Sequence, residues 1–369
     1  MVDLHTQYLR IKPEIDAAMQ KIFDTTSFIQ GAEVKEFSQN LAKYLDCKYV
    51  IPCANGTDAL QIALMALELK PGDEVITTPF TFVATVEVIA LLGLKPVFVE
   101  VNPHTFTLDE NELERAITPK TKAIIPVQLF GQAANMEAIC EIAAKYDIPV
   151  IEDNAQAIGA DFTFKNGKKQ KVGTIGHIGC TSFFPSKNLG CYGDGGAITT
   201  NDAALAKKMQ IICNHGSETR YYHESIGINS RLDSLQAAVL NVKLPLLDSY
   251  NRARQAAAEH YDNALKNNPF IALPARTDYS THVFHQYTLL VSERRDELVK
   301  YLTEKQIPTG VYYPVPLHLQ KAYSYYGFKA GDFPVSESLS QHCISLPIHT
   351  ELTAEQQDYI CQSILEFYS

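Results

Sequence analysis

Lys187 is the residue in this sequence whose surroundings most favour chemistry. It lies on a short, glycine-rich loop between two apolar segments, 180–184 and 196–200, that we expect to be strands. Such a loop can hold an amine away from bulk water, which lowers its pKa and makes it a nucleophile for carbonyl groups. Most lysines between strands are solvated loop residues, so Lys187 alone does not establish chemistry.

A Gly-Thr pair opens the helix expected after the first strand. Gly56 lets the backbone approach a ligand closely, and Thr57 adds a hydroxyl at the positive end of the helix. This geometry suits an anion or a phosphate group. The same residues also fit an ordinary helix cap. The glycine patterns of a P-loop and of a dinucleotide-binding turn do not occur at this position.

Two adjacent carboxylates, Glu152 and Asp153, end another expected strand. Side chains alternate along a strand, so only one of the two can face a pocket. A buried carboxylate is costly unless it has a cationic partner. No histidine or further carboxylate lies nearby at ligand spacing, so we predict no metal site and expect a partner such as a protonated ring nitrogen. Phe82, after the second strand, could stack on such a ring, although phenylalanine is more often a core residue.

The order of apolar segments predicts the architecture. Short apolar segments at 49–53, 74–78, 96–101, 123–129, 149–153, 180–184 and 196–200 read as strands, and amphipathic segments at 58–69, 83–92, 109–116 and 136–145 read as helices between the first five. This alternation predicts an α/β fold with a seven-stranded, mostly parallel sheet covered on both faces. Ligands bind such sheets beyond the carboxyl ends of the strands, where the residues above are expected.

The remaining segments predict a second, smaller unit. Helices are expected within 10–46, a charged hairpin within 161–173, and a long helix from 230 to about 266. Strands at 285–291 and 311–313 and helices at 295–305 and 353–367 follow. We therefore predict a large domain over 1–245 and a small α+β domain over 246–369.

Composition excludes several classes of protein. The formal net charge of -10 argues against nucleic acid as the main partner. There is no uninterrupted apolar run of about 18 residues, so no membrane span is expected. No basic start precedes an apolar run, so we expect no secretory signal. The eight cysteines form no Cys-x-x-Cys pair, which favours a reducing, cytoplasmic location without structural zinc.

Together, a phosphate cup, an aromatic ring, a strand-end aspartate and a loop lysine are the parts of a pyridoxal phosphate (PLP) site. The whole chain also resembles the sugar-nucleotide aminotransferases of PLP fold type I, the DegT/DnrJ/EryC1/StrS family. The resemblance is carried, in order, by the segments NGTDAL at 55–60, PFTFVAT at 79–85, IEDNAQ at 151–156, TSFFPSK at 181–187, GDGG at 193–196, NSRLD at 229–233 and YYPVPLH at 312–318.

The resemblance implies a role for each matched residue. Lys187 would form the Schiff base with the cofactor and then carry the proton between the substrate carbon and the cofactor. Asp153 would pair with the ring nitrogen, Gln156 would contact the ring hydroxyl, and Phe82 would stack on the ring. The phosphate would be held by Gly56, Thr57 and Ser182, and by Asn229 of a neighbouring subunit in a homodimer; the sugar-nucleotide pocket would be lined by Arg231, Tyr312, Tyr313 and His318. Without the resemblance, 229–233 reads as a plain helix cap.

The reaction implied is transamination, with glutamate as the amino donor and a nucleotide-linked keto-sugar as the acceptor. A dehydrating branch of the family has histidine in place of the lysine, so Lys187 argues against that branch. Segment 183–196 most resembles members that act on UDP-2-acetamido-2-deoxy-3-oxo-glucuronate, whose products enter lipopolysaccharide and O-antigen. Tyr312 and Gln128 stand where many relatives have histidine, which leaves the exact sugar open.

Three alternatives stay open at this point. The first is an aminotransferase for a dTDP-linked 3- or 4-keto-6-deoxysugar. The second is a protein that binds sugar nucleotides without turnover, against which the intact Lys187, Asp153 and Gln156 all weigh. The third is an NAD-dependent sugar epimerase or dehydrogenase, which would need a glycine-rich turn after the first strand.

Overall fold

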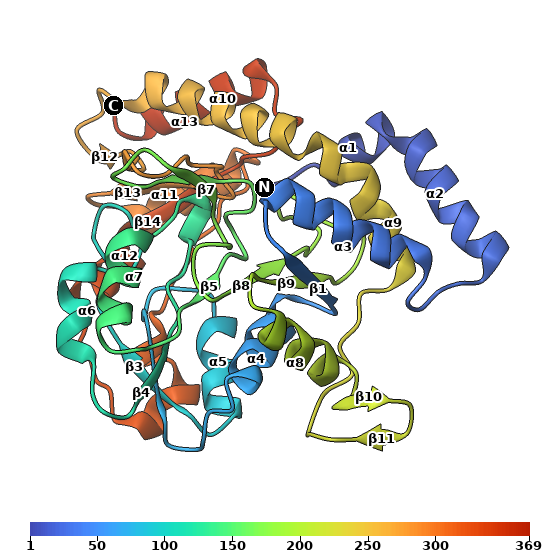
Figure 1. Ribbon diagram of the computed structural model, residues 1–369. Coiled ribbons are helices and arrows are strands. Elements are labelled where there is room, and N and C mark those ends of the chain that lie inside the picture. Colours follow the sequence, from blue (N-terminus) through green and yellow to red (C-terminus); the bar gives the residue numbers. More distant parts are fainter.

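The computed structural model describes residues 1–369, with two strand ladders in the middle and helices around them (Figure 1). One ladder has the order β1-β9-β8-β5, with bounds Tyr49–Cys53, Gly196–Thr200, Ile178–Ser182 and Ile151–Asp153. The other has the order β3-β2-β4, with bounds Lys95–Phe98, Glu74–Thr77 and Thr121–Ile124. All pairings are parallel except those of β9, which is antiparallel to β1 and β8.

The α/β class is as predicted, but one continuous seven-stranded ladder is not confirmed. The two ladders meet edge to edge through isolated parallel bridges, Ile124 with Val150 and Val127 with Asp153. β1 and β9 have the predicted bounds, while β4 and β5 are shorter than expected. The apolar residues beyond their ends are buried in loops, so apolarity alone did not mark where hydrogen-bonded pairing stops.

Helices cover the strands because their apolar faces need burial. The covering helices include α4 (Gly56–Ala66), α5 (Ala84–Leu91), α6 (Glu110–Ala116), α7 (Met136–Lys145) and α8 (Ala203–Cys213). The largest core cluster joins α4, α5 and α8 to both strand ladders, with Ile62 and Ile198 fully buried in it. At the start of α4, the side chain of Asn55 accepts a hydrogen bond from the Asp58 N–H at 2.8 Å.

The N-terminal part forms α1 (Leu4–Arg10), α2 (Lys12–Thr25) and α3 (Ala32–Leu45). The long helix expected from residue 230 is divided into α9 (Ser234–Lys243), a 3₁₀ turn (Leu244–Leu246) and α10 (Leu247–Leu265). Pro245 explains the interruption, since it has no N–H to donate to the preceding turn. The predicted hairpin is confirmed as β6 (Asp161–Thr163) paired with β7 (Lys169–Lys171). A second hairpin, β10 (Ser217–Thr219) with β11 (Tyr222–His223), was not predicted and projects from the body in Figure 1.

The C-terminal part has its own antiparallel sheet, β12 (Ile271–Ala272), β13 (Tyr287–Val291) and β14 (Cys343–Leu346), with α11 (Arg295–Glu304), α12 (Pro334–His342) and α13 (Ala354–Phe367). Helix α10 supplies Leu247 to a core cluster of the first part and Tyr261 to that of the second. A division of the chain at residue 245 stays a prediction. The strand expected at 311–313 is wrong: only Gly310 pairs with Ser345, as an isolated bridge.

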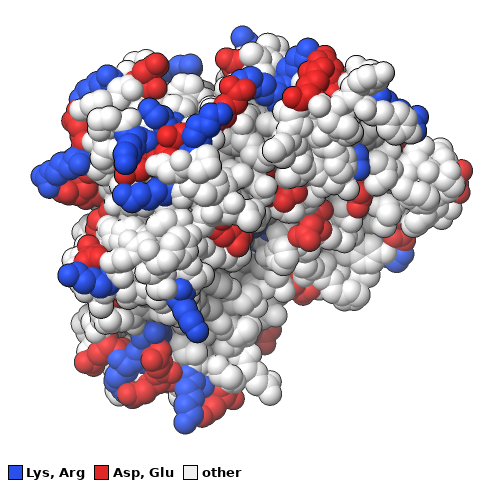
Figure 2. All heavy atoms as spheres, turned by 90° about the horizontal axis from the view of Figure 1, so that it is seen from below, with Lys and Arg blue, Asp and Glu red and all other residues white.

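The surface shows no segregation of charge on the face drawn in Figure 2. Lysine and arginine side chains lie among aspartate and glutamate side chains around its edges, with wide uncharged stretches between them. None of the helices combines the length and the apolar composition that crossing a bilayer requires.

Candidate active site

A cavity of about 390 Å³ brings together nine of the residues singled out in the sequence. It lies beyond the carboxyl ends of β1, β5 and β8, where an α/β sheet is expected to bind its ligand. The nine residues are Gly56, Thr57, Phe82, Asp153, Gln156, Ser182, Lys187, Tyr312 and Tyr313. They come from segments up to 257 residues apart, counted from Gly56 to Tyr313.

Lys187 lines this cavity from the loop between β8 and β9. Loss of hydration lowers the pKa of its ammonium to about 8, and the charge of Asp153 partly opposes that shift. Roughly a tenth of the amine is therefore uncharged at pH 7, against roughly one part in 2,500 for an ordinary lysine.

Asp153 is buried at the end of β5 and has only neutral hydrogen-bond donors. Thr85 Oγ1 donates to Oδ2 at 2.8 Å, and the Ala155 N–H donates to Oδ1 at 3.2 Å. Burial raises the pKa of Asp153 in spite of these two bonds and of the Lys187 charge. The carboxylate therefore lacks a close cation, which a protonated ring nitrogen would supply.

Glu152 points to the opposite face, as strand alternation predicts, and is satisfied inside the protein. It accepts hydrogen bonds from three backbone N–H groups and from one side chain, those of Gly173, Ile175, Gly176 and Gln128, at 2.6–2.9 Å. Burial still raises the pKa of Glu152. Gln128 thus holds Glu152 and is absent from the cavity wall.

The start of α4 forms a cup at one end of the cavity. Asn55 caps only the Asp58 N–H, which leaves the first N–H groups of the helix for a ligand. A Cβ on Gly56 would lie 2.7 Å from Cβ of Ser182, closer than side chains tolerate. Glycine is therefore required here because β8 passes directly behind the helix end.

The amide of Gln156 is fixed at both ends. Its Oε1 accepts a hydrogen bond from the Phe130 N–H at 2.8 Å, and its Nε2 donates to the hydroxyl of Tyr313 at 3.0 Å. Burial raises the pKa of Tyr313, so the phenol stays protonated. Phe82 is half exposed, and its ring centroid is 6.2 Å from that of Tyr313.

Sequence reasoning assigned no role to several residues that belong to the site. Thr85 was matched only as part of segment 79–85, and Asp194 only as part of 193–196. His285 and Gln286, which precede β13, also line the cavity, and His285 Nδ1 is buried without a hydrogen-bond partner. Burial, with the charges of Lys187 and Arg254, lowers the pKa of His285 far below its usual value. Only tertiary structure shows that these residues meet.

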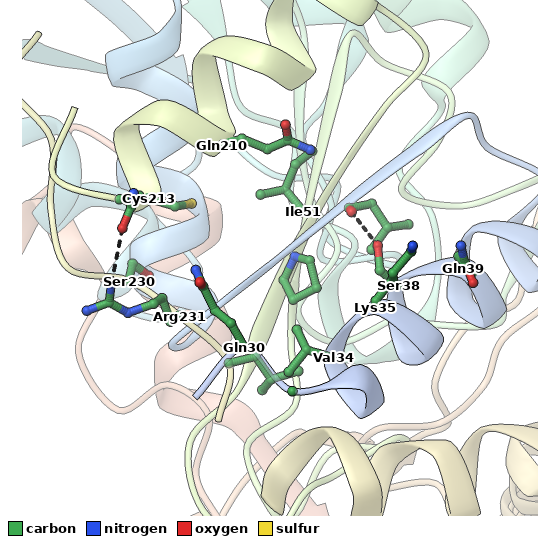
Figure 3. A pocket seen from close by; sticks show the side chains of 15 residues that line it. Gln30, Val34, Lys35, Ser38, Gln39, Ile51, Gln210, Cys213, Ser230 and Arg231 are labelled. Atoms are coloured by element: carbon green, nitrogen blue, oxygen red, sulfur yellow. Dashed lines mark hydrogen bonds between the residues drawn. The ribbon is translucent and has the colours of Figure 1, made fainter. Parts of the chain in front are cut away.

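Asn229 and Arg231 do not reach the cavity within one chain. Asn229 forms an isolated bridge with Asn214, whose side-chain oxygen accepts a hydrogen bond from Arg231 Nη1 at 3.1 Å. Arg231 and Ser230 instead line a second hollow of about 460 Å³, between α3, β1 and α8. In Figure 3, Arg231 lies on one side of this hollow, beside Gln30, while Lys35 and Gln39 come from α3 on the other.

His318 also lies outside the cavity, although its neighbours Tyr312 and Tyr313 line it. It is buried, Nε2 is 3.0 Å from Oε1 of Glu337, and its ring packs edge-on against Phe333. In this chain, His318 therefore holds the segment that follows the two tyrosines against α12.

The residues present fit PLP. The helix end suits a phosphate, the buried carboxylate lacks a cation, and a lysine with a lowered pKa lies in the same cavity. The model of the DegT/DnrJ/EryC1/StrS aminotransferase family matches residues 9–365.

Two curated relatives and one solved structure extend this match. The chain is 48% identical to a pleiotropic regulatory protein of Geobacillus stearothermophilus, over 100% of this chain and 98% of that one. It is 46% identical to the UDP-2-acetamido-2-deoxy-3-oxo-D-glucuronate aminotransferase of Pseudomonas aeruginosa, over 98% of each. A DegT/DnrJ/EryC1/StrS aminotransferase from Brucella abortus has a TM-score of 0.94 and 44% identity, over 100% of this chain and 99% of that one.

Proposed function

Because the chain belongs to the DegT/DnrJ/EryC1/StrS family of PLP-dependent sugar aminotransferases, we propose that it aminates UDP-2-acetamido-2-deoxy-3-oxo-glucuronate with glutamate as donor. The products would be the 3-amino sugar nucleotide and 2-oxoglutarate. The reaction would take place in the cytoplasm, and its amino-sugar product would serve lipopolysaccharide or O-antigen synthesis. The observation that carries transamination is the meeting of Lys187, Asp153 and the α4 cup in one cavity.

Each residue has a task that its geometry suits. When bound, PLP supplies an electron sink, and it also carries the amino group between the two half-reactions. Asp153 would keep the ring nitrogen protonated, and Thr85 would hold that carboxylate in place. Lys187, with its pKa of about 8, can accept a proton from the substrate carbon and return it near neutral pH. The cup at Gly56 would hold the phosphate.

We further propose a homodimer with shared active sites. The only basic side chain among the twenty residues of the cavity wall, histidine aside, is Lys187. Glutamate brings two carboxylates and a uronate brings a third, and planar guanidinium groups are the usual partners for these. Arg231 and Asn229 would enter from the partner subunit, which is consistent with the place of Arg231 in the wall of a separate hollow in this chain.

The choice of a uronate can be tested through Arg231. Arg231→Ala should raise KM for the UDP-linked 3-keto-uronate at least tenfold more than KM for its neutral 3-keto-N-acetylglucosamine counterpart, because a lost bidentate ion pair costs more than a lost neutral contact. Lys35→Ala, in the same hollow, is the matched control for a general loss of positive charge. Equal effects on both sugars would refute the assignment of Arg231.

A second candidate has one observation in its favour. Within one chain, no arginine lines the cavity, and a neutral dTDP-linked 3- or 4-keto-6-deoxysugar needs none. Comparing kcat/KM for the UDP-linked uronate and the dTDP-linked sugars distinguishes the two candidates directly. A non-catalytic sugar-nucleotide binder would turn over neither.

The first experiment is an absorbance spectrum of the purified protein with PLP, before and after glutamate. Transamination predicts a visible band that glutamate converts to a near-ultraviolet band, and Lys187→Ala should lack the visible band. A spectrum identical to that of Lys187→Ala would refute the catalytic function. A visible band that glutamate leaves unchanged would refute glutamate as donor, and other amino acids would then be compared.

A further inference from the structure

Lys243 is a buried ammonium group that the proposed reaction does not use. It lies at the end of α9 with 1% of its surface exposed, and no carboxylate is within ion-pair distance. Its Nζ donates to the Gly190 carbonyl oxygen at 2.9 Å and lies 4.3 Å from the centre of the Tyr192 ring. Burial lowers its pKa to about 8. A buried charge costs several kcal/mol, so an apolar side chain would be cheaper here if packing were the only requirement.

The two groups that Lys243 contacts lie on the loop that carries Lys187. This loop is closed tightly: the Lys187 N–H donates to Phe184 O and the Cys191 N–H to Phe183 O, both at 2.8 Å. A Cβ on Gly190 would lie 2.3 Å from Pro185 O, so Gly190 packs directly on the residues before Lys187. The position of the Gly190 carbonyl therefore constrains the backbone just before Lys187.

Two more polar side chains hold the same loop. Asn188 Nδ2 donates to Asn251 Oδ1 of α10 at 2.7 Å and to a backbone carbonyl at 2.8 Å. The Tyr192 N–H donates to Gln236 Oε1 of α9 at 2.8 Å. Positions 188, 190 and 192 are thus each fixed by a different side chain from α9 or α10.

The N-terminal helices cover this contact. Tyr8 of α1 packs edge-on against Tyr192, with 6.0 Å between ring centroids. Ile11, Ile15 and Val239 form a buried cluster with Tyr192 packed against it. Water is thereby kept from the Lys243–Gly190 bond, which strengthens it.

We propose that Lys243 is a positioning residue: by holding the Gly190 carbonyl under the Tyr192 ring, it fixes the loop so that the Lys187 amine stays at the reacting position in the cavity. The proposal rests on the proposed role of Lys187, but its first test uses the apoprotein and needs no turnover. A loop released from Lys243 would expose the Lys187 amine to more water, and its titration would move toward that of an ordinary lysine.

The test is the pH dependence with which an amine reagent, trinitrobenzenesulfonate, labels Lys187 in the apoprotein, read by mass spectrometry of the peptide. We expect half-labelling of wild type near the pH set by its pKa of about 8. In Lys243→Met the midpoint should rise by about one unit, and Lys243→Arg, which restores a donor, should recover part of the shift. Tyr261→Phe, which removes a buried hydrogen bond to Pro347 O far from the loop, is the control for a general loss of stability.

The holoenzyme gives the second readout. Because misplacing a reacting group costs rate more than binding, Lys243→Met should lower kcat at least about tenfold while KM for the keto-sugar changes little. If Lys243→Met does not fold, Gln236→Leu, which frees the Tyr192 N–H, should shift the labelling midpoint in the same direction. The proposal is overturned if these variants lower thermal stability as Tyr261→Phe does and leave the Lys187 midpoint unchanged. If Lys243→Met raises the Lys187 labelling midpoint as expected but the wild-type protein has no transaminase activity, the proposed function is refuted and the positioning role of Lys243 is not.

Discussion

The bond between Thr85 and Asp153 allows a quantitative test of the electrostatics of the site. Thr85 is fully buried, and its Oγ1 donates to Asp153 Oδ2 at 2.8 Å. Thr85→Val keeps the shape and removes the donor, whereas Thr85→Ser keeps the hydroxyl. A hydrogen bond to an ionised group is worth about 1.5–3 kcal/mol, against about 0.5–1.5 kcal/mol for a neutral pair. The variant should therefore penalise the charged carboxylate by about 1 kcal/mol more than the neutral acid.

The sign of the pH dependence follows from the raised pKa of Asp153. Below its unfolded pKa, about 3.9, Asp153 is protonated in both states. As pH rises, the folded apoprotein holds the proton longer than the unfolded chain does, so stability falls until the folded pKa is passed. Thr85→Val raises that folded pKa further. Its deficit should thus be constant at low pH and widen above the wild-type folded pKa, by about 1.4 kcal/mol per pH unit until the variant's own pKa is reached.

The assay is urea unfolding of the apoprotein between acidic and alkaline pH, followed by titration with PLP. Because a bound protonated ring needs the ionised carboxylate, the penalty of about 1 kcal/mol should make Thr85→Val bind PLP about fivefold more weakly, and Thr85→Ser should bind it nearly as wild type does. Thr81→Val is the matched control, since the Thr81 hydroxyl bonds to Thr85 and not to Asp153. The reasoning fails if the deficit of Thr85→Val is independent of pH and the valine and serine variants bind PLP equally well.

Three further substitutions test other parts of the structure. Gly56→Ala should weaken PLP binding at least tenfold and cost about 1–3 kcal/mol of stability through its clash with Ser182 Cβ; Ser182→Gly in the same chain should recover the stability, and a failure to do so in urea unfolding would refute the clash. Glu152→Gln should cost about 3 kcal/mol in urea unfolding, because its amide NH₂ would face hydrogen-bond donors; a cost below 1 kcal/mol would contradict this. Arg254→Met should cost about 3 kcal/mol in urea unfolding, because it removes the Nη1 donor shared by three buried carbonyl groups. Arg254→Lys, which keeps one nitrogen donor, should recover part of this cost, and an equal cost for both variants would contradict the account.

Several elements could be predicted from the sequence because their signals are local. β1, β9 and α7 have the predicted bounds, since an apolar run or a helical period ends at a clear polar or glycine boundary. Elsewhere a local signal misled. Residues 311–313 have strand-like composition but line the cavity or flank it instead of pairing, because their neighbourhood offers a ligand-sized space in place of a partner strand.

The residues of the candidate site also fall into those with a local sequence signal and those without one. Lys187 and Asp153 were accessible to sequence reasoning, because a lysine on a tight loop and a carboxylate at the end of an apolar strand are unusual in themselves. The assignments of Gln156, Ser182 and Tyr313 came only from the family resemblance. Their partners decide what they do, and those partners are far away in the chain.

What the sequence determined by itself is the order of apolar segments, the residue types at strand ends and hence the chemistry available. Only the tertiary structure decided which groups share one environment. It separated Glu152, satisfied by backbone donors, from Asp153, left without a cation. It placed Arg231 outside the cavity and Lys243 beneath the Lys187 loop. The physical reason is that pKa values and hydrogen bonds depend on distance and burial in space, which the spacing of residues along the chain does not encode.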